Sequence, residues 1–173
     1  GKPIPRDDHG KLEACTEKVK QFALRNFDVS PDGLLTVGVL SPDSHDLLPF
    51  ARAPTLMFDS GSKPGSVHKG NYVSRQLYEQ LEHQGVAATR VERLSVCACV
   101  GGCQKVHQCV KLGVVLTNHL TNEVFCMRND FIVLDTAADG PDVIIGLSAL
   151  RSHAQLTQAF VQNVLGMELQ RGG

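Results

Sequence analysis

The sequence contains no tryptophan, only two tyrosines, and almost no excess of charge of either sign. Its 17 lysines and arginines nearly balance 18 aspartates and glutamates, so the formal net charge is -1. Binding to nucleic acid or to an anionic membrane surface usually requires an excess of basic residues, so we expect neither partner. No apolar run is long enough to span a membrane, and the N-terminus has no signal-like segment.

Hydrophobic residues make up 42% of the 173 residues, which is enough for one domain with a sizeable core. Six cysteines are present, and four of them lie in one short segment. Because the chain shows no secretory signal, we expect reduced thiols and a cytoplasmic location.

Short apolar runs separated by turn residues dominate the middle of the chain. Residues 49–153 therefore predict a mainly β domain, a small closed barrel with one or two short helices. Residues 1–48 are predicted to form an extension with an amphipathic helix at 11–27, where apolar residues recur at helical spacing. A second helix is predicted over 72–83, and residues 154–173 are predicted to form a tail.

A two-residue period follows the second predicted helix. Apolar residues alternate with polar ones and cysteines over 94–100, and the alternation resumes over 106–116. Gly101 and Gly102 lie between the two runs and predict the turn of a β-hairpin. Further along the chain, the Asn-Asp pair at 129–130 predicts another turn.

The stretch from Thr55 to Ser62 has the pattern expected for a reactive turn. A short apolar run leads directly into Asp59-Ser60-Gly61. A strand would hold this turn rigid and present the carboxylate of Asp59, while the glycine would permit a close backbone approach. Asp-Ser-Gly is also ordinary turn chemistry, so a plain turn is the alternative.

A second motif begins most of a domain later, at Asp142. There an apolar strand ends in Ile144-Ile145-Gly146 before a predicted short helix. In this order, with a glycine-tipped hairpin between them, the two motifs resemble the retropepsin-like aspartic proteases, in particular those of long-terminal-repeat retrotransposons. The resemblance covers about residues 53–153.

The resemblance implies a role for each matching residue. Asp59 takes the place of the catalytic aspartate, and Ser60 and Gly61 complete its loop. Ile144, Ile145 and Gly146 take the place of the apolar pair and the glycine that pack beneath that loop. The hairpin around Gly101 and Gly102 takes the place of the flap that closes over the substrate. No metal or other cofactor is implied.

Peptide hydrolysis of this kind requires two carboxylates, one that activates water and one that donates a proton. Two like charges at close range share one proton, as in the aspartic-protease pairs from which this behaviour is known. The chain has a single Asp-Ser-Gly, so the resemblance implies a homodimer in which each chain supplies one Asp59. The implied substrate is a viral-like or retrotransposon polyprotein, of which this chain would be one processed segment.

Asp135 is a rival for the second carboxylate. It also follows an apolar run, 131–134, and precedes Thr136. If it were catalytic, one chain would suffice, as in pepsin-like enzymes. Ala137 occupies the position where such a loop requires glycine, so the homodimer is the favoured interpretation.

The predicted hairpin also contains Cys97, Cys99, Cys103, His107 and Cys109. Thiolates and imidazole are good zinc ligands, but the spacing matches no paired-knuckle pattern. Plain packing, a zinc site and a cross-strand disulfide that regulates flap opening are the three interpretations. Two further functions therefore stand beside the protease: an inactive retropepsin-fold interaction module, and a zinc-binding hairpin domain.

Overall fold

The fold is described by a computed structural model that covers most of the chain. The described residues are 12–26, 35–50, 54–59, 61–62, 70–98, 102–119, 121–136, 139–158 and 161. Across these ranges, every helix is too short or too polar to traverse a lipid bilayer.

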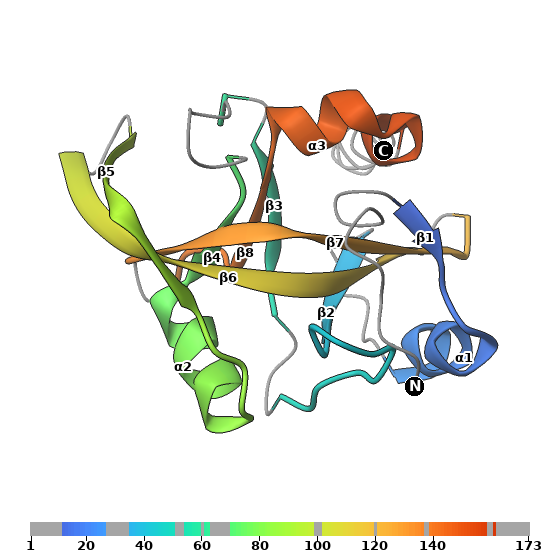
Figure 1. The fold of residues 1–173 in the computed structure, drawn as a ribbon. Coiled ribbons are helices and arrows are strands. Elements are labelled where there is room, and N and C mark those ends of the chain that lie inside the picture. The colour runs from blue at the N-terminus through green and yellow to red at the C-terminus, as the bar shows by residue number, and fades with distance from the viewer. Residues whose placement is uncertain are drawn as a thin grey trace.

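Within the described residues, eight strands form a single sheet, accompanied by short helices (Figure 1). In chain order the elements are β1 (Leu12–Ala14), α1 (Glu17–Asn26), β2 (Leu35–Leu40), β3 (Leu56–Asp59), β4 (Tyr72–Ser74), α2 (Arg75–His83), β5 (Thr89–Ala98), β6 (Gly102–Asn118), β7 (Glu123–Leu134), β8 (Val143–Gly146) and α3 (Leu147–Ser152). The prediction of a mainly β chain with a few short helices is confirmed.

The sheet curls into a half-barrel. Its strand order is β2-β6-β7-β4-β8-β3, while β1 adds to β7 and β5 adds to β6. Among the described strands, β2 and β3 lie at opposite ends of this order and do not pair with each other. The predicted closed barrel is therefore wrong as to closure, because pairing between the terminal strands would be needed to complete it.

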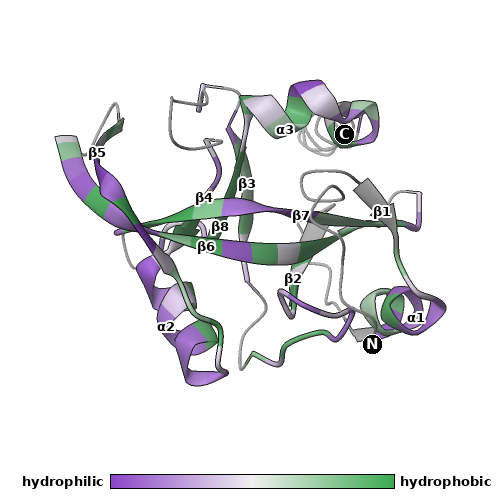
Figure 2. Cartoon of the chain, viewed as in Figure 1, coloured by the Kyte–Doolittle hydropathy of each residue, from purple (hydrophilic) through white to green (hydrophobic). Residues whose placement is uncertain are grey.

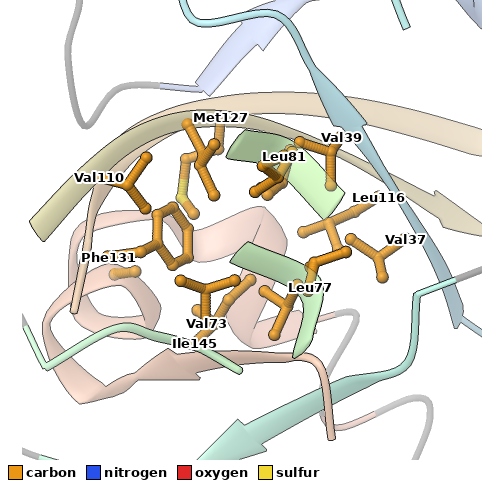
Figure 3. Close-up of a cluster of buried hydrophobic side chains, with 14 of the residues drawn as sticks. Val37, Val39, Val73, Leu77, Leu81, Val110, Leu116, Met127, Phe131 and Ile145 are labelled. Carbon is orange, nitrogen blue, oxygen red and sulfur yellow. The ribbon is translucent and has the colours of Figure 1, made fainter. Parts of the chain in front are cut away.

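The curled sheet encloses the main hydrophobic core (Figure 3). Strands β2, β6, β7 and β8 contribute apolar side chains to one face, and α2 covers them with Leu77, Tyr78 and Leu81. Hydrophobic residues accordingly concentrate on the central strands, whereas the outer side of α2 is hydrophilic (Figure 2). The helix is thus bound to the sheet by its apolar stripe, as its sequence period predicted.

The predicted helix at 11–27 is shorter than expected. Residues Leu12–Ala14 form β1, which pairs with β7, and the helix begins only at Glu17. Thr16 ends the extended segment because its hydroxyl accepts a hydrogen bond from the amide of Val19 at 3.3 Å, as an N-cap does. Helical spacing alone did not reveal this cap.

The predicted helix at 72–83 also begins later than expected. Tyr72–Ser74 form β4, a central strand, and the Ser74 hydroxyl caps α2 by accepting from the amide of Leu77 at 3.1 Å. Gly85 follows the helix with φ +89°, a conformation that favours glycine and is common just beyond the C-terminal end of a helix. Pairing with β7 and β8 decides the conformation of the first three residues.

The predicted turn at 129–130 is wrong. Strand β7 runs without interruption through these residues, with Asn129 paired to Leu112 and Asp130 paired to Lys111 of β6. The ladder with β6 spans ten residue pairs, and its continuity outweighs the local turn preference of an Asn-Asp pair.

The segment 1–48 contributes directly to the domain. Strand β2 pairs with β6 over six residues, and its Val37 and Val39 are part of the main core. At the other end, Leu156 of the predicted tail is fully buried in the same core. The predicted boundaries therefore do not coincide with breaks in packing.

Two disulfides contradict the expectation of reduced thiols. Cys15 is bonded to Cys126, which ties the start of the chain to β7, and Cys97 is bonded to Cys103 across the β5–β6 hairpin. The absence of a signal-like segment was the sole basis for that expectation, and the predicted cytoplasmic location depended on it. That location stays a prediction.

Candidate active site

Asp59 is the last residue of β3, a strand at one end of the sheet. Strand β3 runs parallel to β8, and the register pairs Asp59 with Gly146. The apolar side chains of Leu56 and Phe58 pack against the main core and fix the strand. The two resembling motifs of the sequence, about 85 residues apart, therefore meet side by side, as the resemblance implied.

The turn after β3 is closed by its own carboxylate. The amide of Gly61 donates to Oδ1 of Asp59 at 2.9 Å, and the amide of Ser62 donates to the Asp59 carbonyl at 3.1 Å. The Asp59 side chain itself is partly exposed. The carboxylate is thus oriented by a backbone donor and remains open to solvent on another side. Ser60 lies outside the described residues.

Gly146 forms the floor beneath this turn. A Cβ atom at position 146 would lie 2.3 Å from the Gly70 carbonyl oxygen and 2.7 Å from that of Ser62. Only glycine allows so close a backbone approach. The Gly146 amide donates to Oδ1 of buried Asn71 at 2.9 Å, and the Leu147 amide donates to the Ser62 carbonyl at 2.8 Å.

The Ser62 hydroxyl makes a further contact between the Asp59 turn and the backbone at Gly70. Oγ of Ser62 donates to the Gly70 carbonyl at 2.6 Å. The turn that carries Asp59 is therefore bonded to the start of α3 through Ser62 and to the segment before β4 through Gly70. These two attachments, to segments that are distant from the turn and from each other in the sequence, fix its position.

Asp142 is a supporting residue to which the sequence analysis gave no role. Its carboxylate is buried and accepts hydrogen bonds from the Thr55 amide at 3.0 Å, the Thr55 hydroxyl at 3.3 Å and the Ser74 hydroxyl at 3.2 Å. It joins the starts of β3, β8 and α2. Its position just before a buried apolar strand was the available signal, because a buried carboxylate must be hydrogen-bonded.

The structure separates the rival Asp135 from Asp59. Strand β7 ends where Leu134 pairs with Ser74, next to the start of β8, whereas Asp59 lies beside the end of β8. Oδ1 of Asp135 accepts from Nε of Arg75 at 2.6 Å, in an ion pair on the surface. The two carboxylates therefore cannot form a pair within one chain.

The predicted hairpin is present as β5 and β6. Gly102 begins β6 with φ +73°, a conformation that favours glycine, while Gly101 lies outside the described residues. The hairpin projects from the body of the molecule, and its tip lies on the same side as the end of β3, at the top of Figure 1. Valine and leucine side chains of its lower part pack against Tyr72, Ile132 and Ile144.

The described part of the hairpin does not bring the candidate zinc ligands together. Cys97 and Cys103 are bonded to each other, and within the described residues no group of three ligating side chains comes together. Burial, with a smaller contribution from nearby Asp130, raises the pKa of the Cys109 thiol to about 11. That thiol is protonated at neutral pH and is a poor metal ligand in that form. Cys99 lies outside the described residues.

The chain matches no protein-family model, no curated protein and no solved structure. What the site can do is therefore inferred from its geometry. One solvent-accessible carboxylate, oriented by a backbone amide at the end of a rigid strand, can accept a proton from water. It cannot at the same time protonate a leaving group, so one chain provides half of an acid–base pair.

Proposed function

We propose that the chain is one half of an aspartic endopeptidase of the retropepsin-like type, active as a homodimer. The supporting observation is that the Asp59 turn packs directly on the backbone of Gly146, where a Cβ atom would clash with the Gly70 and Ser62 carbonyls. The Gly61 amide orients the Asp59 carboxylate in this turn. A plain surface turn needs no such floor. The parallel pairing of the two motifs supports the same proposal.

In the proposed reaction, Asp59 of one chain and Asp59 of a second copy share one proton across a two-fold axis. The ionised carboxylate removes a proton from a water molecule, which attacks the carbonyl carbon of the scissile peptide bond. The protonated carboxylate donates to the carbonyl oxygen. The tetrahedral intermediate then collapses with transfer of a proton to the leaving amine, which breaks the C–N bond and restores the shared proton.

The proposed mechanism requires a homodimer because, among the described residues, we find one suitable carboxylate per chain. Asp135, the rival, lies at the opposite end of β8 and is paired with Arg75. Asp142 is buried and accepts three hydrogen bonds. Neither carboxylate lies beside that of Asp59 in the same chain. The proposed substrate is a segment of a viral-like or retrotransposon polyprotein, held in extended form beneath the β5–β6 hairpin.

The test compares the wild type with Asp59→Asn in a peptide-library cleavage assay at acidic and neutral pH. Asparagine keeps the size of the side chain and can still accept from the Gly61 amide, but it cannot act as a base. We expect cleavage by the wild type at acidic pH, inhibition by a transition-state mimic of peptide hydrolysis, and no cleavage by the variant.

Asp135→Asn is the matched control. It changes the other aspartate that follows an apolar strand, and its side chain makes only an exposed ion pair, which contributes little to stability. We expect this variant to retain cleavage. If the wild type and Asp59→Asn behave identically while both are folded dimers, the protease proposal is wrong and the chain is an interaction module.

A further inference from the structure

The β5–β6 hairpin carries a disulfide in an unusual place for structural support. Cys97 and Cys103 are direct register partners, one pair before the last pair of the hairpin. Only six positions separate them in sequence, and both residues are exposed. A disulfide that closes so short a loop removes less freedom from the unfolded chain than one that closes a long loop, so it adds less to global stability.

The second disulfide differs in each of these respects. Cys15 and Cys126 are 111 positions apart, and Cys126 is fully buried beneath α1. A reductant in solution can reach the sulfur atoms at the hairpin tip, whereas the sulfur of Cys126 is covered by protein. Access is one of the factors that set the rate of thiol–disulfide exchange.

We propose that the Cys97–Cys103 bond is a thiol-exchange site that controls the order of the hairpin tip. A thiolate of a dithiol reductant attacks one of the two sulfurs, which breaks the Cys97–Cys103 bond and forms a mixed disulfide. The second thiol of the reductant then displaces the remaining cysteine. Two electrons pass from the reductant to the protein, the reductant becomes a cyclic disulfide, and both cysteines take up protons.

Reduction affects only the tip because the lower hairpin is attached independently. The side-chain amide of Gln104 donates to the Asp135 carbonyl and accepts from the Asp135 amide, both at 2.9 Å. Below it, Val91, Leu94 and Val96 pack against Tyr72, Ile132 and Ile144. The tip beyond Gln104 has only the last two register pairs, Cys97↔Cys103 and Ala98↔Gly102.

One apolar cluster joins the lower part of the hairpin to β8, the strand that pairs with β3 beside Asp59. Ile144 of β8 packs with the lower hairpin and is also the register partner of Met57, two residues before Asp59. A tip that is ordered by its disulfide presents a fixed surface toward that side of the molecule. The consequence for cleavage rests on the proposed function: loss of order at the tip weakens binding of an extended peptide and raises KM more than it lowers kcat.

The first measurement does not depend on activity. The full chain is titrated with dithiothreitol, quenched by alkylation and mapped by mass spectrometry, with hydrogen exchange recorded at each step. We expect Cys97 and Cys103 to be labelled at lower reductant concentration than Cys15 and Cys126. Exchange at residues 96–98 and 102–104 should then accelerate about tenfold, while β7 and β8 stay protected.

Two variants assign the response to this bond. Cys97→Ser/Cys103→Ser should show the accelerated exchange without reductant and should not respond further. Cys99→Ser changes a neighbouring cysteine outside the bond and should respond as the wild type does. Simultaneous labelling of all four bonded cysteines, or an unchanged response in the double variant, would overturn the inference.

Cleavage assays keep the two proposals apart. Asp59→Asn should show the full exchange response to reductant and no cleavage. If no form of the protein cleaves peptides but the tip still responds, the proposed function fails and the exchange site stands. If the wild type cleaves and reductant leaves both KM and tip exchange unchanged, the exchange site fails and the protease stands.

Discussion

The carbonyl oxygen of Gly70 lies 2.3 Å from the place where a Cβ atom of residue 146 would stand. The Ser62 carbonyl oxygen would be 2.7 Å from the same Cβ atom, so the backbone on both sides of the Asp59 turn packs against Gly146. Both neighbours are backbone atoms, which cannot rotate out of the way as a side chain would. The position of the Asp59 carboxylate therefore depends on residue 146 being glycine, which has no Cβ atom.

Gly146→Ala should disturb the site more than its size suggests. The added methyl group must push the Gly70 or Ser62 backbone away, which we expect to cost about 2 kcal/mol of unfolding free energy. Urea unfolding measures that loss, and peptide cleavage should fall further than the folded fraction does. Ile145→Val, next in β8, is the control: it should cost about 1 kcal/mol while cleavage per folded molecule stays unchanged. Equal cleavage by both variants would contradict the role given to Gly146.

Asp142→Asn should destabilise the protein because it replaces one of two accepting oxygens with an NH₂ group that donates. The carboxylate accepts from Thr55 and Ser74, and asparagine would direct an NH₂ group toward one of those donors. For a buried site we expect a loss of about 2 kcal/mol in urea unfolding. Asp139→Asn, at an exposed turn nearby, should change stability by less than about 0.5 kcal/mol. A wild-type midpoint for Asp142→Asn would show that the carboxylate is dispensable.

Removal of the Cys15–Cys126 bond should be costly. It closes a loop with a sequence separation of 111, for which chain entropy alone predicts a loss of about 5 kcal/mol. Cys15→Ala/Cys126→Ala, unfolded in urea without reductant, gives the value. Cys97→Ser/Cys103→Ser provides the comparison, since its separation is only six. A smaller loss for the long loop than for the short one would show that the N-terminal segment adds little to the fold.

Cys109 should react slowly at neutral pH. With a pKa of about 11 instead of 9.0, its thiolate fraction at pH 8 falls to about one hundredth of the ordinary value. Alkylation followed by peptide mapping should be correspondingly slow in the folded protein and normal in urea. The folded state binds the proton more tightly, so this group's contribution to stability should be lost as pH rises from about 9 to about 11. Equal rates in both states would contradict the burial of this thiol.

Local patterns predicted the strands well where packing agreed with them. The strand before Asp59, the strand before Gly146, and the Gly102 hairpin follow from apolar periods and glycines. Their juxtaposition came from the resemblance, since no local rule pairs β3 with β8. The errors have one cause: pairing partners distant in sequence turned 72–74 into a strand and carried β7 through residues 129 and 130. The disulfides were likewise decided by proximity in the fold.

The most direct test of the half-site proposal is subunit mixing. A fixed amount of wild-type chain is mixed with increasing amounts of Asp59→Asn, at concentrations where both are dimeric, and peptide cleavage is followed. If each active unit needs two copies of Asp59, inactive mixed dimers form and cleavage falls to about half in an equimolar mixture. Cleavage that stays constant as the variant is added would show that one chain acts alone and would contradict the account.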